Sequence, residues 1–315
     1  MGLTIGVDIG GTKVAGGVMD EDGTILARAR VDTPARDAEA AENAIVSVVE
    51  QLRASHDVQG VGLAVAGFVN ANRSSVYFAP NLPDWDNEPL RDDVARRVGL
   101  PVVVENDANA AAWGEYRFGA GRGEVDLVCV TVGTGIGGGV VINGALVRGR
   151  FGLAAEIGHI QMVDAGRLCG CGQHGCLEQY ASGRALVRDA RERAAELRGD
   201  AARLLRLGDG TPEGVMGHHV TEAAELGDVV ALAAFTAIGG WLGQGLADLA
   251  AVLDPGRFIL GGGVSEAGDL LLRPTREAFA ATLTGGGRLP VAEVVQATLG
   301  NDAGMAGAAD LARQP

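Results

Sequence analysis

The residues best placed for chemistry lie in one short segment, EIGHIQMVDAGRLCGCGQHGCLE, between Glu156 and Glu178. It holds a histidine and three of the four cysteines of the chain, namely His159, Cys169, Cys171 and Cys176. Three thiols and one imidazole form a closed tetrahedral zinc site, and the intervening glycines permit the tight turns it needs. The segment therefore predicts a structural Zn²⁺ ion that also fixes Glu156 and Glu178. Unrelated buried thiols are the weaker alternative, because free cysteines seldom cluster with so much glycine.

A carboxylate able to act on a substrate lies in VVVENDAN, residues 102–109, where an expected strand runs into a helix beginning near Ala108. Asp107 at this junction has two possible roles. It is either the N-cap of the helix or a general base at the carboxyl end of a strand, where open α/β sheets place ligands. Asn106 beside it would exchange hydrogen bonds with a polyhydroxylated substrate. The residues alone leave both roles of Asp107 open.

Three glycine loops follow expected strands and could approach phosphates with their backbone N–H groups. They consist of Gly10, Gly11, Thr12 and Lys13, of Gly133, Thr134 and Gly135, and of Gly261, Gly262 and Gly263. A strand follows each of the first two loops, so neither is a GxxxxGK[ST] loop or a strand–helix GxGxxG turn. Together the loops predict a nucleotide site of another kind. Lys13 suits a phosphate, and Asp8 could hold Mg²⁺ through water or cap the turn.

The elements that must position these residues repeat along the chain. The first segment predicts a strand, a glycine loop, a second strand and an Asp-Gly turn, in TIGVDIGGTKVAGGVMDEDGTIL. A later segment predicts the same order of elements with an Asn-Gly turn, in DLVCVTVGTGIGGGVVINGALV. Strands alternate with helical patterns elsewhere, among them 183–206 and 222–253. We therefore expect an α/β protein with two duplicated domains in contact.

Charge and apolar patterning exclude several classes of protein. A net charge of -14 argues against nucleic acid or an anionic membrane as a partner. No secretion signal precedes the first expected strand, and the apolar run 229–253 contains Gln244 and Asp248, as a buried helix would. We expect a cytoplasmic protein with reduced thiols and no membrane partner.

The chain resembles the sugar kinases of the ROK (repressor, open reading frame, kinase) family over nearly its whole length. The matching motifs are VDIGGTK, ENDANAAAWGE, VTVGTGIGGGVVINGALVRG, EIGHI with CGCGQHGCLE, and ILGGGV. The resemblance implies a two-domain actin-like ATPase fold (ribonuclease H-like, hexokinase-type) with duplicated βββαβα-type units. We expect a smaller N-terminal domain, 1–117 with a C-terminal helix at about 301–315. The larger domain, 118–300, would carry the zinc loop.

By this resemblance Asp107 takes the proton from the primary hydroxyl of the sugar as it attacks the γ-phosphate. The sugar would be held by Gly67, Asn106, Asp107, Glu156, His159 and Glu178, with His159 also on zinc. The loops at 10–13 and 133–135 would cradle the phosphates of ATP with Mg²⁺, and Gly261–Gly263 would lie near adenosine. In AVAG at 64–67 an alanine precedes the glycine, where many relatives have proline. This difference weakens only the assignment of the substrate sugar.

Glucose is the expected sugar, because the bacterial ATP-dependent glucokinases of the family resemble ENDANAAAWGE and CGCGQHGCLEQYASG most. The expected enzyme makes glucose 6-phosphate for glycolysis and assembles as a homo-oligomer, a dimer or tetramer. Fructose, mannose or an N-acetylhexosamine as acceptor and polyphosphate as donor stay open. The repressors of the family carry a winged-helix domain before the first phosphate loop, for which this chain leaves no room. A non-catalytic sugar sensor is disfavoured by the intact Asn106–Asp107 pair.

Overall fold

The computed structural model describes residues 2–34, 37–80, 82–286 and 288–313. Its contacts divide the chain into two compact units. Unit 1 comprises Met1–Cys129, Gly138–Ala155 and Thr298–Pro315, and unit 2 comprises Val130–Gly137 and Glu156–Ala297. The domains expected from the sequence, with a boundary at 117/118 and a returning helix at 301–315, stay a prediction.

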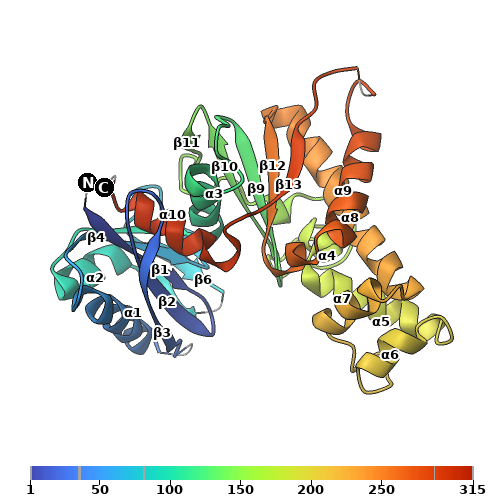
Figure 1. Cartoon of the computed structure of the whole chain (residues 1–315), viewed down its shortest axis with the longest axis horizontal. Coiled ribbons are helices and arrows are strands. Elements are labelled where there is room, and N and C mark those ends of the chain that lie inside the picture. Colours follow the sequence, from blue (N-terminus) through green and yellow to red (C-terminus); the bar gives the residue numbers. More distant parts are fainter. Residues whose placement is uncertain (1, 35–36, 81, 287, 314–315) are drawn as a thin grey trace. The chain divides into compact units, whose positions relative to one another are not determined.

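Unit 1 is built on a mixed sheet with the strand order β3-β2-β1-β4-β8 (Figure 1). Its strands are β1 (Leu3–Ile9), β2 (Lys13–Met19), β3 (Ile25–Asp32), β4 (Val58–Val65) and β8 (Val102–Asn106). The first three strands form antiparallel hairpins, whereas β1, β4 and β8 run parallel. The parallel strands are nearly continuous apolar runs, as expected for a sheet covered on both faces.

Four helices pack on this sheet in the described part of unit 1: α1 (Ala38–Arg53), α2 (Leu90–Val98), α3 (Asp107–Phe118) and α10 (Ala303–Leu311). α10 lies so close to β1 and β4 that only glycine fits beneath it. A Cβ atom at Gly6 would lie 1.9 Å from the carbonyl oxygen of Met305, and one at Gly62 would lie 1.8 Å from that of Ala308. The last helix of the described chain thus packs directly on the first sheet.

A small antiparallel sheet of β5 (Phe68–Val69), β6 (Val76–Ala79) and β7 (Leu82–Glu88) also belongs to unit 1. This sheet was not predicted from the sequence, because its strands are short and β7 carries Pro83, two aspartates and an asparagine. Such residues are depleted in strands. The first strand of this sheet directly follows Gly67, one of the predicted sugar ligands.

The second large sheet has the order β11-β10-β9-β12-β13, the same pattern as the first sheet read strand by strand. Its strands are β9 (Leu127–Val132), β10 (Ile136–Ile142), β11 (Ala145–Leu146), β12 (Arg257–Gly261) and β13 (Glu293–Gln296). The Asn-Gly turn predicted between β10 and β11 is present, with positive φ at Asn143 and Gly144. The predicted duplication and the α/β class of fold are confirmed.

The helical elements of unit 2 are η1 (Ile157–His159), α4 (Glu178–Ala181), α5 (Gly183–Glu196), α6 (Ala202–Leu207), α7 (Gly217–Glu225), α8 (Val229–Leu253), η2 (Gly263–Ala267) and α9 (Asp269–Thr282); η3 (Gly300–Asp302) precedes α10 in unit 1. The single helix expected at 183–206 was wrong, because this segment forms two helices, α5 and α6. The expectation that 222–253 is mostly helix is confirmed, with a break between α7 and α8. Gly227, at φ +80°, ends the turn after α7, and Asp228 caps α8 by accepting hydrogen bonds from two backbone N–H groups.

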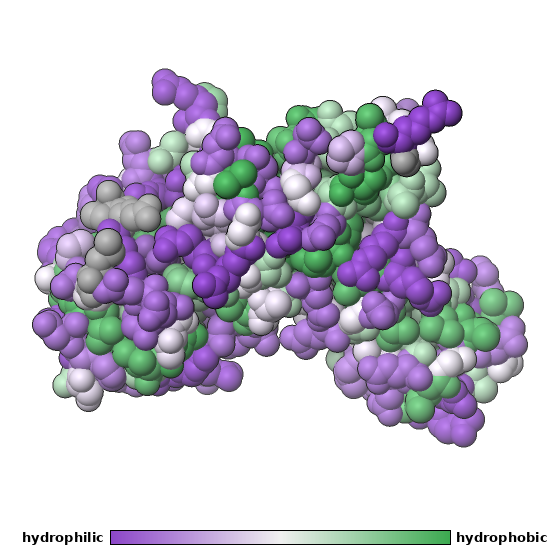
Figure 2. Space-filling view, turned by 45° about the horizontal axis from the view of Figure 1, so that its top comes forward, coloured by the Kyte–Doolittle hydropathy of each residue, from purple (hydrophilic) through white to green (hydrophobic). Residues whose placement is uncertain are grey.

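Among the described helices, α8 alone is long and apolar enough to meet the length and composition of a membrane span. In its most apolar window 56% of the residues are buried inside the protein, as in the core helix of a soluble protein. Figure 2 shows polar residues over most of the viewed face, with smaller apolar patches between them. The expectation that 229–253 belongs to a buried helix agrees with this burial.

Candidate active site

The carboxyl ends of β1, β4 and β8 bring several predicted residues of unit 1 to one edge of the first sheet. Ile9 pairs with Val65, and Val65 pairs with Asn106. Asp8, Gly67 and Asp107 therefore lie on or just beyond neighbouring strand ends. A Cβ atom built on Gly304, in α10, would lie 3.8 Å from the carboxyl carbon of Asp8 and 3.9 Å from the carbonyl oxygen of Asp107.

Asn106, and not Asp107, is the N-cap of α3. Its side-chain oxygen accepts a hydrogen bond from the backbone N–H of Asn109 at 3.0 Å. Its side-chain nitrogen donates to the carbonyl oxygen of Gly67 at 3.1 Å and to Asp107 Oδ1 at 3.2 Å. Asp107 is the first residue of the helix, and its Oδ1 also accepts from the N–H of Ala108 at 2.9 Å. The capping role considered for Asp107 was wrong.

The first glycine loop of unit 1 is closed by a hydrogen bond from the N–H of Gly10 to the carbonyl oxygen of Lys13 at 3.0 Å. Thr33, just after β3, donates its hydroxyl to the carbonyl oxygen of Gly10 at 2.8 Å, which holds the loop against the hairpin. Burial raises the pKa of Asp8, and the nearby ammonium group of Lys13 opposes that shift. The loop thus places a cation and a carboxylate side by side, as a phosphate and Mg²⁺ site requires.

Unit 2 contains a pocket of about 1160 Å³ that joins the two other glycine loops. Gly133 and Thr134 line it on one side, and Gly263 with Val264 line it on another. α5 and α7 complete the wall, with Arg188, Arg191, His218 and Glu222 among the lining residues. Gly262 keeps the loops close, since a Cβ atom there would lie 2.7 Å from the carbonyl oxygen of Val132. A pocket of this size is large enough for a nucleotide.

The N-terminus of α5 lies directly on the loop at 133–135. The N–H of Gly183 donates to the carbonyl oxygen of Gly133 at 2.8 Å, and Ser182 caps the helix by accepting from the N–H of Ala185. A helix N-terminus carries a partial positive charge and favours anions. Neither this helix start nor Arg184 was predicted as part of the site, although Ser182 before the apolar pattern was the signal for the helix start.

Glu178 lies against the same loop. Its Oε2 accepts a hydrogen bond from the N–H of Ile136 at 3.1 Å, and its Oε1 is 3.5 Å from a guanidinium nitrogen of Arg184. Arg184 also donates to the carbonyl oxygen of Thr134 at 3.0 Å. A Cβ atom at Gly135 would lie 2.2 Å from Glu178 Oε2, so this approach depends on glycine. Within unit 2 the predicted sugar ligand Glu178 is thus connected to the predicted phosphate loop.

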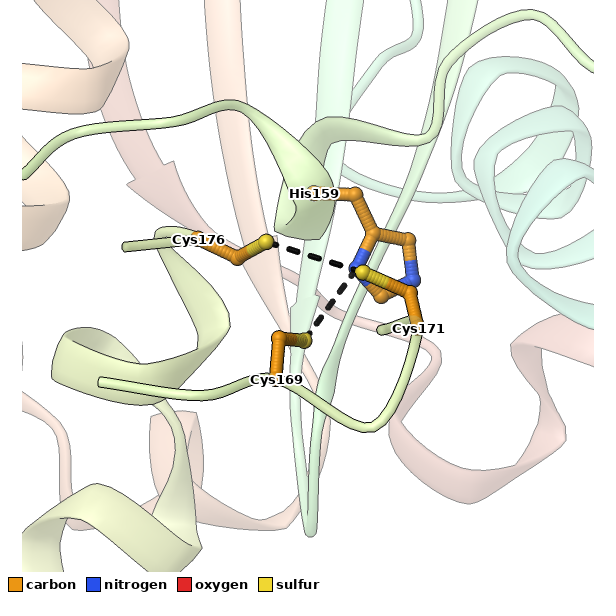
Figure 3. A group of neighbouring side chains, drawn as sticks. All are labelled: His159, Cys169, Cys171 and Cys176. Carbon is orange, nitrogen blue, oxygen red and sulfur yellow. Dashed lines mark hydrogen bonds between the residues drawn. The ribbon is translucent and has the colours of Figure 1, made fainter. Parts of the chain in front are cut away.

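The four predicted zinc ligands converge in unit 2, with their ligand atoms all within 4.8 Å of one another (Figure 3). The Sγ of Cys169 is 3.6 Å from Nδ1 of His159, and the Sγ atoms of Cys171 and Cys176 are 3.7 Å apart. Ligand atoms bonded at about 2.0–2.3 Å to one zinc ion lie about 3.5–3.8 Å apart at the corners of a tetrahedron. The donors and their spacing fit a zinc ion.

The cysteine loop owes its shape to glycine. The N–H of Gly172 donates to the carbonyl oxygen of Cys169 at 3.0 Å in a tight turn, with φ +89° at Gly172. Gly175 has φ +79°, and a Cβ atom there would lie 1.7 Å from the carbonyl oxygen of Val163. Substitution of either glycine would therefore displace a cysteine.

The second ring nitrogen of His159 points away from the thiols. Its Nε2 lies 4.0 Å from a carboxylate oxygen of Glu156, three residues earlier. Burial raises the pKa of Glu156, and His159 opposes that shift. The loop therefore places Glu156 and His159 together, as predicted, and leaves Nδ1 of His159 to the cysteines.

Comparison with known proteins agrees with this combination of fold and site. The model of the ROK family matches residues 4–315, and the chain belongs to that family. The glucokinase of Streptomyces coelicolor is 58% identical over 315 residues, covering 100% of this chain and 99% of that protein. The glucokinase of Thermotoga maritima is 38% identical over 319 residues, covering 98% and 97%. The crystal structure of a ROK family glucokinase from Streptomyces griseus superposes with a TM-score of 0.91 at 58% identity over the whole of both chains.

Proposed function

We propose that the chain transfers the γ-phosphoryl group of ATP to the 6-hydroxyl of glucose. The observation that carries the proposal is the full-length similarity to the Streptomyces griseus enzyme, whose crystal structure contains glucose and AMPPNP. The similar Streptomyces coelicolor protein is likewise a glucokinase. ATP is the donor in this proposal, and the product, glucose 6-phosphate, would enter glycolysis.

Asp107 is the general base in this reaction. It follows a strand end, its Oδ1 is oriented by Asn106 and by the N–H of Ala108, and a carboxylate there accepts the proton of the attacking hydroxyl. Gly67, Asn106, Glu156, His159 and Glu178 hold the other hydroxyls. Because phosphoryl transfer requires mainly alignment and charge stabilisation, these residues act by fixing the acceptor oxygen.

ATP is held by the glycine loops. Its adenosine occupies the pocket of unit 2 beside Gly261–Gly263, and the backbone of the loops at 10–13 and 133–135 binds the phosphates. Mg²⁺ bound with the nucleotide would neutralise charge on the phosphates, and Asp8 is the residue of unit 1 that would hold it. Lys13 and the N-terminus of α5 add positive charge.

Zinc has a structural role in this proposal. His159, Cys169, Cys171 and Cys176 are four protein ligands, which leaves no open coordination position for substrate. A zinc ion on these ligands would fix the loop that carries Glu156, His159 and Glu178. Its loss would weaken sugar binding and stability before it affected phosphoryl transfer.

A panel of donors and sugars with the purified protein tests the proposal. We expect ATP with glucose to give the highest kcat/KM, with fructose, mannose and N-acetylhexosamines well below it. Sites that bind a sugar by hydrogen bonds to its hydroxyl groups often discriminate strongly between sugars, because a mismatched sugar leaves buried polar groups unpaired. A preference for N-acetylmannosamine or fructose, or for polyphosphate over ATP, would overturn the assignment.

A further inference from the structure

Glu105 is a buried carboxylate immediately before the Asn106–Asp107 pair. The residue is 3% exposed and is surrounded by donors. Its Oε1 accepts from the N–H of Asn106 and from the side-chain nitrogen of Asn109, each at 3.2 Å. Its Oε2 accepts from Nε of Arg148 at 2.6 Å. A buried charge with this many partners is costly to disturb, because removal of one partner leaves the other uncompensated.

These contacts reach the predicted base by two routes. In the first route, Glu105 accepts a hydrogen bond from the backbone N–H of Asn106. In the second, Glu105 accepts from the side chain of Asn109, and the backbone N–H of Asn109 donates to the side chain of Asn106. Asn106 in turn donates to Asp107 Oδ1. The carboxylate of Glu105 therefore restrains the residue that orients Asp107, although it lies on the opposite face of the strand from Asn106.

Arg148 brings a distant segment into the same network. It follows β11, its side chain is 24% exposed, and its carbonyl oxygen accepts from the N–H of Ala154 at 3.1 Å. Ala155 ends this stretch of unit 1, and the next residue is Glu156, a proposed sugar ligand. One ion pair therefore restrains both the start of α3 and the stretch that leads to Glu156.

We propose that Glu105 and Arg148 form a positioning pair for the sugar acceptor, which aligns Asp107 and restrains residues 148–155, the stretch that precedes Glu156. The inference rests on the proposed roles of Asp107 and Glu156. Neither member of the pair is assigned contact with substrate. Their effect is on alignment, where a displacement of about 1 Å costs on the order of 10²-fold in rate.

Arg148→Met tests the pair, because it removes the guanidinium but keeps a long side chain. We expect kcat/KM for glucose to fall about 10- to 100-fold, with a rise in KM and a fall in kcat. AMPPNP affinity should stay within about twofold of wild type, because neither Glu105 nor Arg148 lines the nucleotide pocket or belongs to a glycine loop. Arg148→Lys, which restores the charge without the guanidinium geometry, should recover part of the loss.

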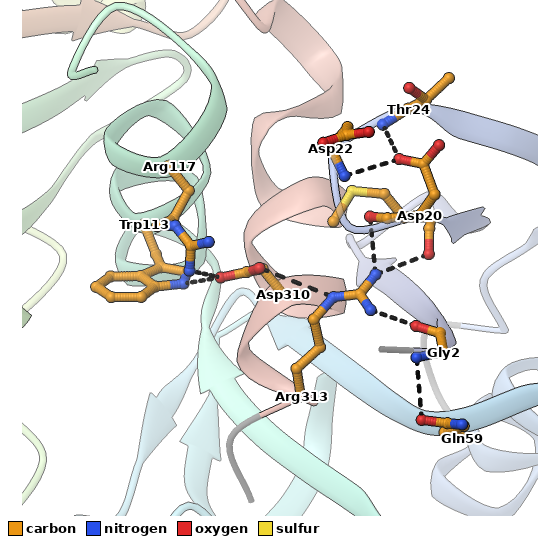
Figure 4. Close-up of polar contacts among 10 residues, drawn as sticks. Gly2, Asp20, Asp22, Thr24, Gln59, Trp113, Arg117, Asp310 and Arg313 are labelled. Atoms are coloured by element: carbon orange, nitrogen blue, oxygen red, sulfur yellow. Dashed lines mark hydrogen bonds and ion pairs between the residues drawn. The ribbon is translucent and has the colours of Figure 1, made fainter. Parts of the chain in front are cut away.

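Arg117→Met is the matched control. Arg117 donates to Asp310 Oδ2 at 2.6 Å, with side chains 34% and 2% exposed, so this ion pair equals the first in length and in burial of its carboxylate (Figure 4). It lies at the other end of α3 and on α10. Arg117→Met should lower the melting temperature comparably yet leave the KM for glucose and kcat unchanged.

The kinetic comparison of the two variants tests the positioning role. If Arg148→Met and Arg117→Met lose equal amounts of kcat and KM performance, the Glu105–Arg148 pair has only a structural role and the proposal is wrong. Wild-type kinetics in Arg148→Met would also overturn the proposal. If Arg148→Met does not fold, Arg148→Lys replaces it, and the same KM and kcat criteria apply. Failure of the proposed function is distinguishable, because then wild-type protein itself would not phosphorylate glucose.

Discussion

Asn106 has the capping role that the sequence left open for Asp107. Asn106 satisfies the helix N-terminus, which releases Asp107 from capping. A strand that ends in Asn-Asp before an alanine-rich helix could be predicted from VVVENDAN, and the convergence of His159, Cys169, Cys171 and Cys176 could be predicted from their spacing. The Glu105–Arg148 pair could not, because its members are 43 residues apart and neither has a local pattern that indicates the other.

Asp107→Asn is the sharpest change at this scale, because it keeps the shape of the side chain but cannot accept the proton. We expect kcat to fall roughly 10²- to 10⁴-fold, the usual contribution of a general base, with AMPPNP affinity retained. Steady-state kinetics and AMPPNP titration measure the two quantities. Asp22→Asn, at an exposed turn, is the control and should behave as wild type. Near-normal turnover in Asp107→Asn would remove Asp107 from the mechanism.

Single substitutions can also decide which histidine, His159 or His174, is the fourth ligand of the proposed zinc site. His159 Nδ1 lies 3.6 Å from Cys169 Sγ, whereas His174 is exposed and its carbonyl oxygen accepts from the side chain of Gln161. Elemental analysis should find about one zinc per chain in wild type and in His174→Ala, but little in His159→Ala or Cys176→Ser. Retention of zinc by the latter two would show that the ligands were misassigned.

At the scale of elements, strands and glycine loops were predicted better than helix ends. Apolar runs before glycine specify β1, β9 and β12 directly. The break after α7 depends on Gly227, a single residue that a helical apolar pattern does not reveal. The sheet of β5, β6 and β7 escaped prediction because its strands are stabilised by pairing with one another and not by local preference.

Three elements of unit 1 meet in a cluster of carboxylates, formed by Glu42 on α1, Glu88 on β7 and Asp93 on α2. Burial and the charges of Glu88 and Asp93 raise the pKa of Glu42 from 4.5 to about 7, against the attraction of Arg97. The folded state therefore holds a proton that the unfolded chain releases. This contribution to stability is fully present below pH 4.5 and is lost as the pH rises through about 7.

Glu42→Gln should consequently raise the free energy of unfolding at pH 8 by about 1–3 kcal/mol and change it little at pH 4.5. Urea unfolding at the two pH values measures the difference. Glu39→Gln, at an exposed position on the same helix, should give no gain at pH 8. A Glu42→Gln effect that is equal at both pH values would contradict a shifted pKa.

At the scale of the whole molecule, the repeated strand order could be predicted from two similar glycine hairpins. The boundaries of the two compact units lie within β9 and β10, where no sequence pattern marks them. A dimer or tetramer, expected from the resemblance, stays a prediction. The residues proposed to bind ligands are unequally divided. The pocket proposed for the nucleotide is lined by residues of unit 2. Of the residues proposed to bind glucose, Asn106 and Asp107 belong to unit 1, and Glu156, His159 and Glu178 belong to unit 2.

This division predicts different patterns of amide hydrogen exchange for the two ligands. Bound ligand stabilises only the structure that it contacts, by about 2.7 kcal/mol at 100 times Kd. AMPPNP alone should slow exchange most at 183–192 and 217–225 in unit 2, whereas glucose should slow it at 105–109 and at 156–160, one segment from each unit. L-glucose, the mirror image, should protect neither. Protection by glucose confined to unit 2 would mean that Asp107 is not beside the bound sugar, because its amide and those of its helix start would then exchange as in the free enzyme.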